Sequence, residues 1–281
     1  MTDSIDTSDK PQSLTTIALF GANGQIGERI LQALNSSNQH SFKTVAFIPP
    51  HSNIQQRATR DNLATDLEGV DAVVSALNGP ALEAQGTIQD AAADAGVKRF
   101  HPSEYGLHQI YRKPNDPMGL CSSCRAVNHP ATRSGKMSFT MISCGDSYNQ
   151  AREKVWCPWT QPPNAVDKNT IHVIGNPDAG ADYTHMNDFA NFLVATLVKP
   201  AKSENQYLNM VSDTISHSSI AKLLEKYSDK KTDLNVQDEH AIHKETQGKG
   251  EFVRPKSQIQ NGIFPDLKVT SFQRYFQERV V

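Results

Sequence analysis

Three glycines near the N-terminus have the spacing G-x-x-G-x-x-G: Gly21, Gly24 and Gly27. This spacing is the feature of the sequence that most directly indicates a binding site. An apolar run at 17–20 precedes them, and a helical pattern of apolar residues begins at Ile26. Gly21 allows a tight turn, Gly24 lets backbone amides approach a pyrophosphate, and Gly27 allows close packing of helix on sheet. Unpaired N–H groups at the start of that helix attract the anion. The loop predicts a dinucleotide site, with a tight turn that binds nothing as the alternative.

The cysteines are the other residues whose spacing suggests chemistry. The sequence has four of them: Cys121, Cys124, Cys144 and Cys157. Cys121 and Cys124 form a C-x-x-C pair, but no second pair or histidine stands at the spacing that zinc requires. We therefore predict reduced thiols and no metal site, with a redox pair at Cys121 and Cys124 as the alternative.

Strand-like and helix-like segments alternate through the first half of the chain. The expected strands are 17–20, 44–48, 72–76, 97–101 and 138–143, and an Ala-rich helix is expected at 81–95. This alternation predicts the α/β class, with a Rossmann-like, doubly wound parallel sheet. Such a sheet brings the glycine loop and the ends of the later strands to one edge.

The second half is less regular and predicts a smaller C-terminal lobe. The expected elements are a packed loop at 156–164, strands at 170–175 and 206–211, and helices at 189–198 and 216–227. Asn187 and Asp188 are expected to cap the helix at 189–198, and the H-x-x-D spacing of His185 and Asp188 is interpreted as part of this cap. The charged segment 228–257 is expected to be exposed helix or loop.

Composition limits the partners and the location. The chain has 281 residues and a formal net charge of -2, so bulk charge indicates no nucleic-acid partner. No segment approaches the roughly 18 apolar residues of a membrane span, and the polar residues 1–13 are not a signal peptide. We expect a disordered arm at 1–13, a dinucleotide-binding core at 14–150, and a substrate lobe at 151–281 with elements returning to the core. The expected location is the cytoplasm, with the nucleus open.

Three segments carry a resemblance to a known family. They are the glycine loop at 21–27, the Gly-Val-Asp-Ala-Val-Val-Ser-Ala stretch at 69–76, and Val-Lys-Arg-Phe-His-Pro-Ser-Glu-Tyr-Gly at 97–106. Together they resemble the NmrA-like and isoflavone-reductase-like family, an atypical branch of the short-chain dehydrogenase/reductase superfamily. The resemblance implies a Rossmann core, a smaller substrate lobe, and NADP as cofactor, with NAD open.

The resemblance also assigns site residues. Those that would hold the dinucleotide are Gly21, Asn23, Gly24, Gln25, Ile26, Gly27, Ser75, Ala76, Leu77, Phe100, Pro102 and Ser103. The loop from Glu104 to Gly106 would open toward the substrate. The candidate proton donors are Tyr105 and Ser103, with Tyr148 or a bound water behind them.

The adenosine side departs from the family pattern. The second expected strand ends at Phe47 and Ile48, without the arginine of NADP-preferring members or the acid of an NAD site. Arg57 or Arg60 could substitute for that arginine. The interval from Ile48 to 71 is also short for the helix and third strand that usually fill it, so one of these is compressed or missing.

The catalytic side departs as well, because no lysine lies between Lys113 and Lys136, where reductases of the family carry theirs. Cys124 or Arg125 stands near that position, and arginine cannot shuttle protons, since its pKa stays above about 12. The sequence predicts an NAD(P)H-dependent reductase of a small aromatic or specialised-metabolite substrate. A non-catalytic, NADP-sensing regulator and a member that no longer binds cofactor are the alternatives. A protein partner or a homodimer stays open.

Overall fold

The computed structural model describes residues 13–48, 60–106, 128–152, 156–162, 167–237 and 247–279. The chain forms two compact units, the first from 1–103, 121–141 and 193–207, and the second from 104–120, 142–192 and 208–281. β5 (Ser138–Ser143), α7 (Met186–Val198) and β9 (Gln206–Asn209) each run from one unit into the other. The domain limits predicted at residues 13, 150 and 151 stay predictions.

A six-stranded sheet in the order β2-β1-β3-β4-β5-β9 organises the first unit. Besides β5 and β9, its strands are β1 (Thr16–Phe20), β2 (Lys43–Phe47), β3 (Ala72–Ser75) and β4 (Arg99–His101). Neighbouring strands from β2 to β5 pair in parallel, and Phe20 lies in register with Phe47 on one side and Ser75 on the other. The predicted α/β class with a Rossmann-like parallel sheet is confirmed.

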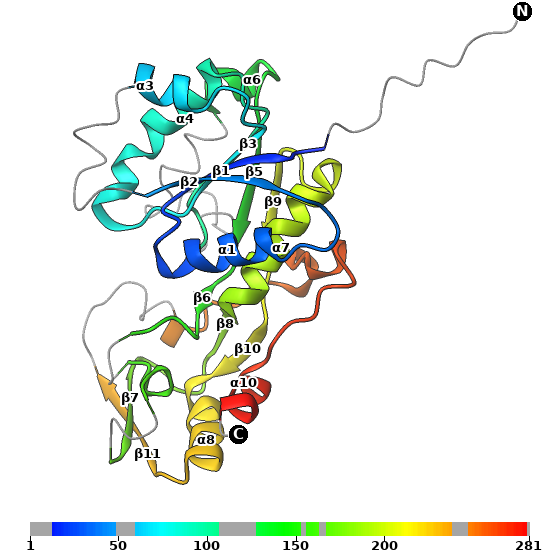
Figure 1. Ribbon diagram of the computed structural model, residues 1–281. Helices are drawn as coiled ribbons and strands as arrows, with labels where there is room; N and C mark the ends of the chain where they lie inside the picture. The colour runs from blue at the N-terminus through cyan, green and yellow to red at the C-terminus, as the bar shows by residue number, and fades with distance from the viewer. Residues whose placement is uncertain are drawn as a thin grey trace, which may run out of the picture. The chain divides into compact units, whose positions relative to one another are not determined.

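Helices cover both faces of this sheet, as Figure 1 shows: α1 (Gln25–Asn35) lies on one face, and α3 (Arg60–Asp66) and α4 (Gln85–Asp94) lie on the other. On the α3–α4 face, Phe20, Val73 and Phe100 from the strands pack against apolar residues of both helices. Burial of this apolar surface is the main force that holds the strand ends in place.

The segment expected as one helix at 81–95 consists of two elements. Gly79–Ala84 form a 3-10 helix, η1, and α4 begins only at Gln85. The side chain of Asn78 accepts a hydrogen bond from Gly79 N (2.7 Å), which caps η1, and Pro80 fits its first turn. The short α6 (Pro130–Arg133) also belongs to this unit. Between β2 and β3, the described residues form α3 and no strand, in line with the short interval noted above.

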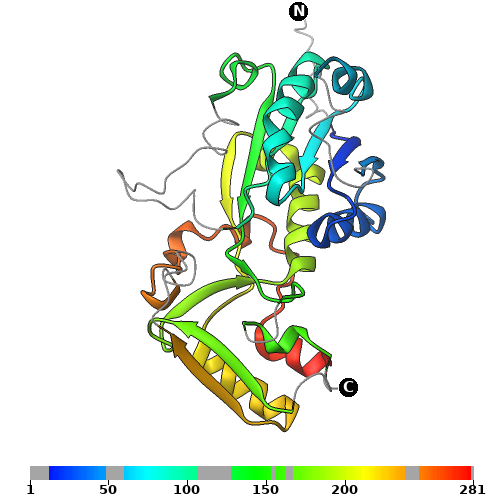
Figure 2. The same cartoon turned by 90° about the vertical axis from the view of Figure 1, so that its left-hand side faces the viewer.

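The second unit contains two small sheets. A three-stranded sheet has the order β10-β8-β6, and β7 pairs with β11 in parallel. The strands are β6 (Asp146–Ser147), β7 (Asn169–Ile174), β8 (Gly180–Thr184), β10 (Asp213–Ser216) and β11 (Thr232–Gln237). Besides the first part of α7, its described residues form η2 (Pro158–Thr160), α8 (His217–Ser228), η4 (Lys256–Gln258), η5 (Asn261–Ile263) and α10 (Phe272–Arg279), while η3 (Pro200–Lys202) belongs to the first unit. Figure 2 shows α8, in yellow, lying along the β7–β11 pair.

An aromatic cluster fills the core of the second unit. Tyr148 lies 4.2 Å from Phe272 between ring centroids, and its hydroxyl donates to Thr270 O (2.6 Å). The indole N–H of Trp159 donates to Tyr148 O (2.6 Å), so the polar groups of both Tyr148 and Trp159 have acceptors. This places Trp159 within the packed loop expected at 156–164.

Two expectations for the second half are wrong. The first concerns α7, which begins at Met186, so Asn187 and Asp188 lie in its first turn and do not form its N-cap. Asp188 instead accepts hydrogen bonds from Ser212 Oγ (2.7 Å) and Thr270 N (2.6 Å). The carboxylate of Asp188 therefore connects the segments around Ser212 and Thr270 to the start of α7.

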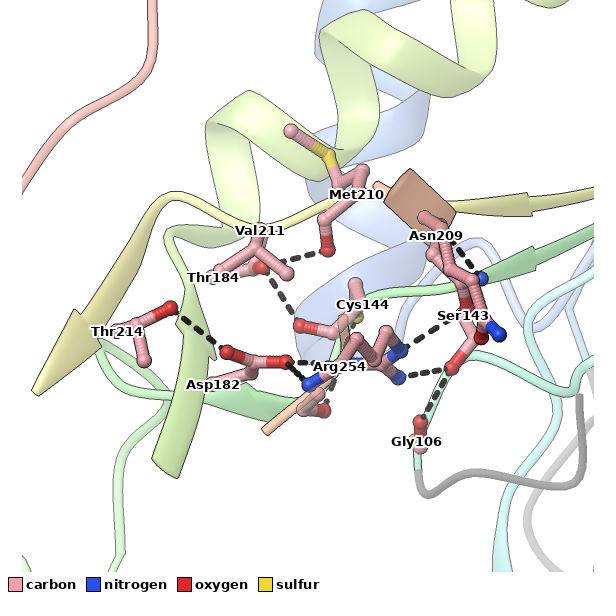
Figure 3. Close-up of polar contacts among 12 residues, drawn as sticks. Gly106, Ser143, Cys144, Asp182, Thr184, Asn209, Met210, Val211, Thr214 and Arg254 are labelled. Carbon is pink, nitrogen blue, oxygen red and sulfur yellow. Dashed lines mark hydrogen bonds and ion pairs between the residues drawn. The ribbon is translucent and has the colours of Figure 1, made fainter. Parts of the chain in front are cut away.

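The second wrong expectation concerns 228–257, which is not simply exposed helix or loop. It contributes the strand β11 and two fully buried side chains, Phe252 and Arg254. Arg254 forms an ion pair with Asp182 at 3.2 Å, and both side chains are fully shielded from solvent. Figure 3 shows the guanidinium lying between Asp182 and Ser143.

None of the helices in the described part of the chain is long and apolar enough to cross a membrane.

Candidate dinucleotide site

The glycine loop connects β1 to α1 and has the backbone geometry that its spacing predicts. Gly21 has a φ of +78°, and a Cβ there would lie 2.7 Å from Ala76 O. Its N–H donates to Phe47 O (3.2 Å), which fixes the loop to the end of β2. A glycine is therefore required at position 21, both because of the positive φ and because the backbone after β3 comes so close.

Gly27 and Gly24 have different surroundings. A Cβ on Gly27 would overlap the carbonyl group of Gly21, whereas one on Gly24 would meet only Gly21 O, at 3.3 Å. Gly24 is the N-cap of α1 and provides no side-chain cap, so the first turn of the helix is open to an anion. Asn23, Gly24 and Gln25 are exposed at the tip of the loop, while Ile26 is half-buried.

The end of β3 forms the next part of the site. Ser75 is buried, and Ala76 N donates to Phe20 O (2.8 Å), which extends the β1–β3 pairing to the base of the glycine loop. Leu77 follows as a buried residue. The three residues assigned here by the resemblance therefore lie directly beside the loop, through the contact of Gly21 with Ala76.

The end of β4 is tied to the end of β3 by Ser103. Its hydroxyl donates to Leu77 O (2.7 Å), and its backbone N–H donates to Gln85 Oε1 (2.7 Å). Phe100 and Pro102 are buried just before it. Gln85, at the start of α4 and only 6% exposed, was not identified from the sequence, where it is one polar residue in an Ala-rich helix. All predicted cofactor-binding residues lie in the first unit.

The proton-donor candidates are strongly constrained. In the second unit, Tyr105 is buried, with its ring 4.6 Å from that of Phe189, and burial is the main reason that its pKa lies well above the usual value. Burial also raises the pKa of Tyr148, whose hydroxyl proton is donated to Thr270 O. Tyr148 is thus a core residue, and the donor roles of Tyr105 and Ser103 stay predictions.

His101 is an unexpected feature at the end of β4. Its side chain is fully buried, and neither ring nitrogen has a hydrogen-bond partner among the described residues. Burial, with a smaller contribution from the positive charge of Arg99, lowers the pKa of His101 to about 3. The imidazole is therefore neutral at physiological pH.

Several residues singled out from the sequence lie outside the described part of the chain. They are Arg57, Lys113, Cys121, Cys124 and Arg125. Cys144 and Cys157 are described, are buried and form no disulfide, and burial raises the pKa of Cys144 to about 12. The described residues contain no cluster of histidine, cysteine or acidic side chains that could hold a metal ion.

Comparison with known proteins gives a consistent relationship. A model of the NmrA-like family matches residues 13–247. The isoflavone reductase homolog IRL of Zea mays is 26% identical over 239 residues, which cover 76% of each chain. Among solved structures, AtPrR2 with NADP+ and (+)pinoresinol has a TM-score of 0.71 at 17% identity, covering 95% of this chain and 99% of that one.

The binary complex of leucoanthocyanidin reductase with NADPH, from Vitis vinifera, has a TM-score of 0.70 at 18% identity, over 94% of this chain and 99% of its own. At such identities these structures establish the shared fold. The family match extends from the glycine loop through β11 and covers most of the sequence. The protein therefore belongs to the NmrA-like family.

Proposed function

We propose that this protein is an NAD(P)H-dependent reductase of a small aromatic or specialised-metabolite substrate, with NADP as the expected cofactor. The observation that carries the proposal is the open tip of the glycine loop, where a Cβ on Gly24 would meet only Gly21 O. A backbone surface of this kind, at the start of a helix, suits a pyrophosphate. The names of the Zea mays relative and of the solved reductases support the same reaction class.

The residues of the first unit would hold the dinucleotide in a defined order. The loop from Gly21 to Gly27 would bind the pyrophosphate, Ser75 to Leu77 would line the adenosine side, and Phe100 to Ser103 would lie beside the nicotinamide. When bound, the nicotinamide supplies the hydride. Ser103 would hold this edge rigid, because both of its polar groups are fixed to the loop after β3 and to α4.

The hydroxyl groups of Ser103 and Tyr105 differ in whether their proton is already used in a hydrogen bond within the protein or is held by burial. Ser103 already donates its proton to Leu77 O, so its part is to position the strand end. Tyr105 keeps its proton at physiological pH, because burial raises its pKa, and its hydroxyl therefore still has a proton to give. We propose Tyr105 as the donor, with a bound water as the alternative, since the same burial weakens Tyr105 as an acid.

A non-catalytic NADP-sensing protein is the second candidate. The observation that favours it is that Ser103 donates its proton within the protein and Tyr105 is only 8% exposed. Turnover separates the candidates: a reductase consumes NADPH when offered enones, quinones and other unsaturated aromatic compounds. Saturable NADPH binding with no consumption across the whole panel would favour the sensor, and a site that binds no dinucleotide would contradict both.

Gly24→Ala tests the site itself. We expect it to weaken NADPH binding by about tenfold or more, because a methyl group at the loop tip keeps the backbone amides from the phosphates, and hydrogen bonds to charged groups contribute about 1.5–3 kcal/mol. Calorimetric titration with NADPH measures the effect. Gly27→Ala is unsuitable, because its Cβ overlaps the Gly21 carbonyl and would distort the loop.

Gly262→Ala is the matched control. A Cβ at Gly262 meets no atom within 4 Å, and this residue lies in the second unit. Gly262→Ala should unfold at the wild-type temperature. Gly24→Ala should unfold slightly lower, because alanine is a poorer N-cap than glycine and its Cβ would lie 3.3 Å from Gly21 O. Only Gly24→Ala should lose affinity for NADPH. Equal NADPH affinity of Gly24→Ala and wild type would show that the loop does not hold the pyrophosphate.

A further inference from the structure

The loop that carries the proposed proton donor is fixed to the end of β5 through its carbonyl groups. Tyr105 O accepts hydrogen bonds from the backbone N–H and from the thiol of Cys144, each 2.9 Å long. The next carbonyl, Gly106 O, accepts from the hydroxyl of Ser143 (3.1 Å). The ring of Tyr105 also packs against that of Phe189, and all of these residues belong to the second unit. Two successive carbonyl groups and one ring contact therefore determine where the Tyr105 side chain lies.

Arg254 sets the direction of the Ser143 hydroxyl. A guanidinium group has donors only, so Ser143 Oγ must accept the hydrogen bond that it shares with Arg254 Nη2. The single hydroxyl proton is then left for another acceptor, and it is donated to Gly106 O. A hydrogen bond from a charged donor also polarises the hydroxyl, which strengthens its own donation. Figure 3 shows this relay from the guanidinium through Ser143 to Gly106.

The guanidinium is itself held in one orientation. Arg254 Nε donates to Asn209 Oδ1 (2.9 Å), and Asp182 Oδ2 accepts from both the guanidinium (3.2 Å) and the backbone N–H of Arg254 (2.8 Å). The other carboxylate oxygen, Asp182 Oδ1, accepts from Thr214 Oγ1 (2.7 Å). Because the side chains of Arg254 and Asp182 are fully buried, water does not compete for these contacts. A buried network of this kind is rigid, so the relay to Gly106 starts from a fixed point.

We propose that Arg254 and Ser143 are positioning residues, which hold the loop from Glu104 to Gly106 so that the hydroxyl of Tyr105 lies where proton transfer requires it. The inference rests on the proposed function, in which Tyr105 is the donor. A proton donor must lie within hydrogen-bond distance of the group that it protonates, and a displacement of about 1 Å can lower a rate about a hundredfold. The C-terminal segment that carries Arg254 thus acts on catalysis through the backbone of this loop.

Ser143→Ala tests the relay, because it removes the link to Gly106 O and keeps the ion pair of Arg254 with Asp182. We measure NADPH consumption with the enone or quinone that the wild type reduces fastest. We expect kcat and kcat/KM to fall together by about tenfold or more, with KM for NADPH nearly unchanged. Arg254→Met is unsuitable for this test, since it leaves the buried carboxylate without its cation.

Thr214→Val is the matched control. It removes one hydroxyl from the same network, at the Asp182 oxygen that does not contact Arg254. Both variants should lower the temperature of unfolding, because each leaves a partner in this network without a hydrogen bond. Only Ser143→Ala should lower kcat. An equal loss of kcat in the two variants would overturn the inference, because general loosening of the second unit would then explain it.

Hydrogen exchange at the Cys144 amide gives a readout that does not depend on turnover. This N–H donates to Tyr105 O, so it exchanges when the loop leaves the end of β5. NMR of protein labelled at cysteine alone should show exchange about tenfold faster in Ser143→Ala and unchanged in Thr214→Val. Unchanged exchange in Ser143→Ala, or faster exchange with unchanged kcat, would contradict the positioning role.

The two readouts also separate this inference from the proposed function. If the wild type reduces no compound of the panel, the proposed function fails, and the catalytic part of the inference fails with it. The exchange rate at Cys144 still decides whether Ser143 holds the loop.

Discussion

Arg254→Met is expected to lower the free energy of unfolding by about 3–5 kcal/mol, because it leaves the buried carboxylate of Asp182 without its cation. The Arg254 guanidinium donates to Asp182 Oδ2 (3.2 Å), Asn209 Oδ1 (2.9 Å) and Ser143 Oγ (2.5 Å). The backbone N–H of Arg254 also donates to Asp182 Oδ2 (2.8 Å). One side chain thus donates to acceptors that are far apart in sequence. Urea denaturation of wild type and Arg254→Met measures the decrease in the free energy of unfolding.

Two further variants test whether the loss of stability depends on the planar guanidinium group and on burial of the ion pair. Arg254→Lys should remain strongly destabilised, because an ammonium group cannot reproduce the planar fork that reaches all three acceptors. Arg274→Met removes an exposed partner of Glu278 on α10 and should leave the unfolding midpoint unchanged. A loss in Arg254→Met no larger than that in Arg274→Met would show that the buried pair contributes little.

His101 is expected to make the fold sensitive to acid. Its pKa is about 3 in the folded protein and about 6.5 when unfolded, so between these values the unfolded chain binds the extra proton. Stability should therefore fall as the pH drops from about 6.5 to about 3, by at most about 5 kcal/mol from this residue, and its contribution should be constant outside that range. Urea denaturation at several pH values measures the slope.

His101→Leu and His101→Gln separate titration from burial of a polar group. Both should reduce the acid slope, because neither side chain titrates. At pH 7, His101→Leu should also raise the free energy of unfolding by about 1–3 kcal/mol, because it removes a buried polar group that has no partner among the described residues. His101→Gln keeps a polar group there and should not gain this stability. An acid slope that is the same in all three proteins would assign the effect to other groups.

The glycine loop could be predicted from the sequence because its determinants are local. The turn at Gly21, the close packing at Gly27 and the start of α1 depend on residues a few positions apart. The expected strands at 44–48, 72–76 and 138–143 were also close to β2, β3 and β5. β3 and β5 are buried along their whole length, as expected for inner strands of a parallel sheet.

Long-range polar contacts could not be predicted in the same way. Arg254 pairs with Asp182 across 72 residues, and the surrounding charged sequence resembles an exposed surface. The contact of Ser103 N with Gln85 depends on the packing of α4, which the composition of an Ala-rich helix does not fix. Similarly, β11 alternates between half-buried and exposed residues and has a weak hydrophobic signal, so its pairing with β7 was missed.

The interleaving of the two units determines when the fold can be completed during synthesis. β5 gains its second neighbour in the large sheet only after β9, at 206–209, has been made. The carboxylate of Asp182 lacks its cation for longer, because that cation comes from residue 254. On the ribosome, the nascent protein therefore carries an open strand edge until β9 has been made and a carboxylate without its cation until residue 254 has been made, and chaperones would be needed most in this interval.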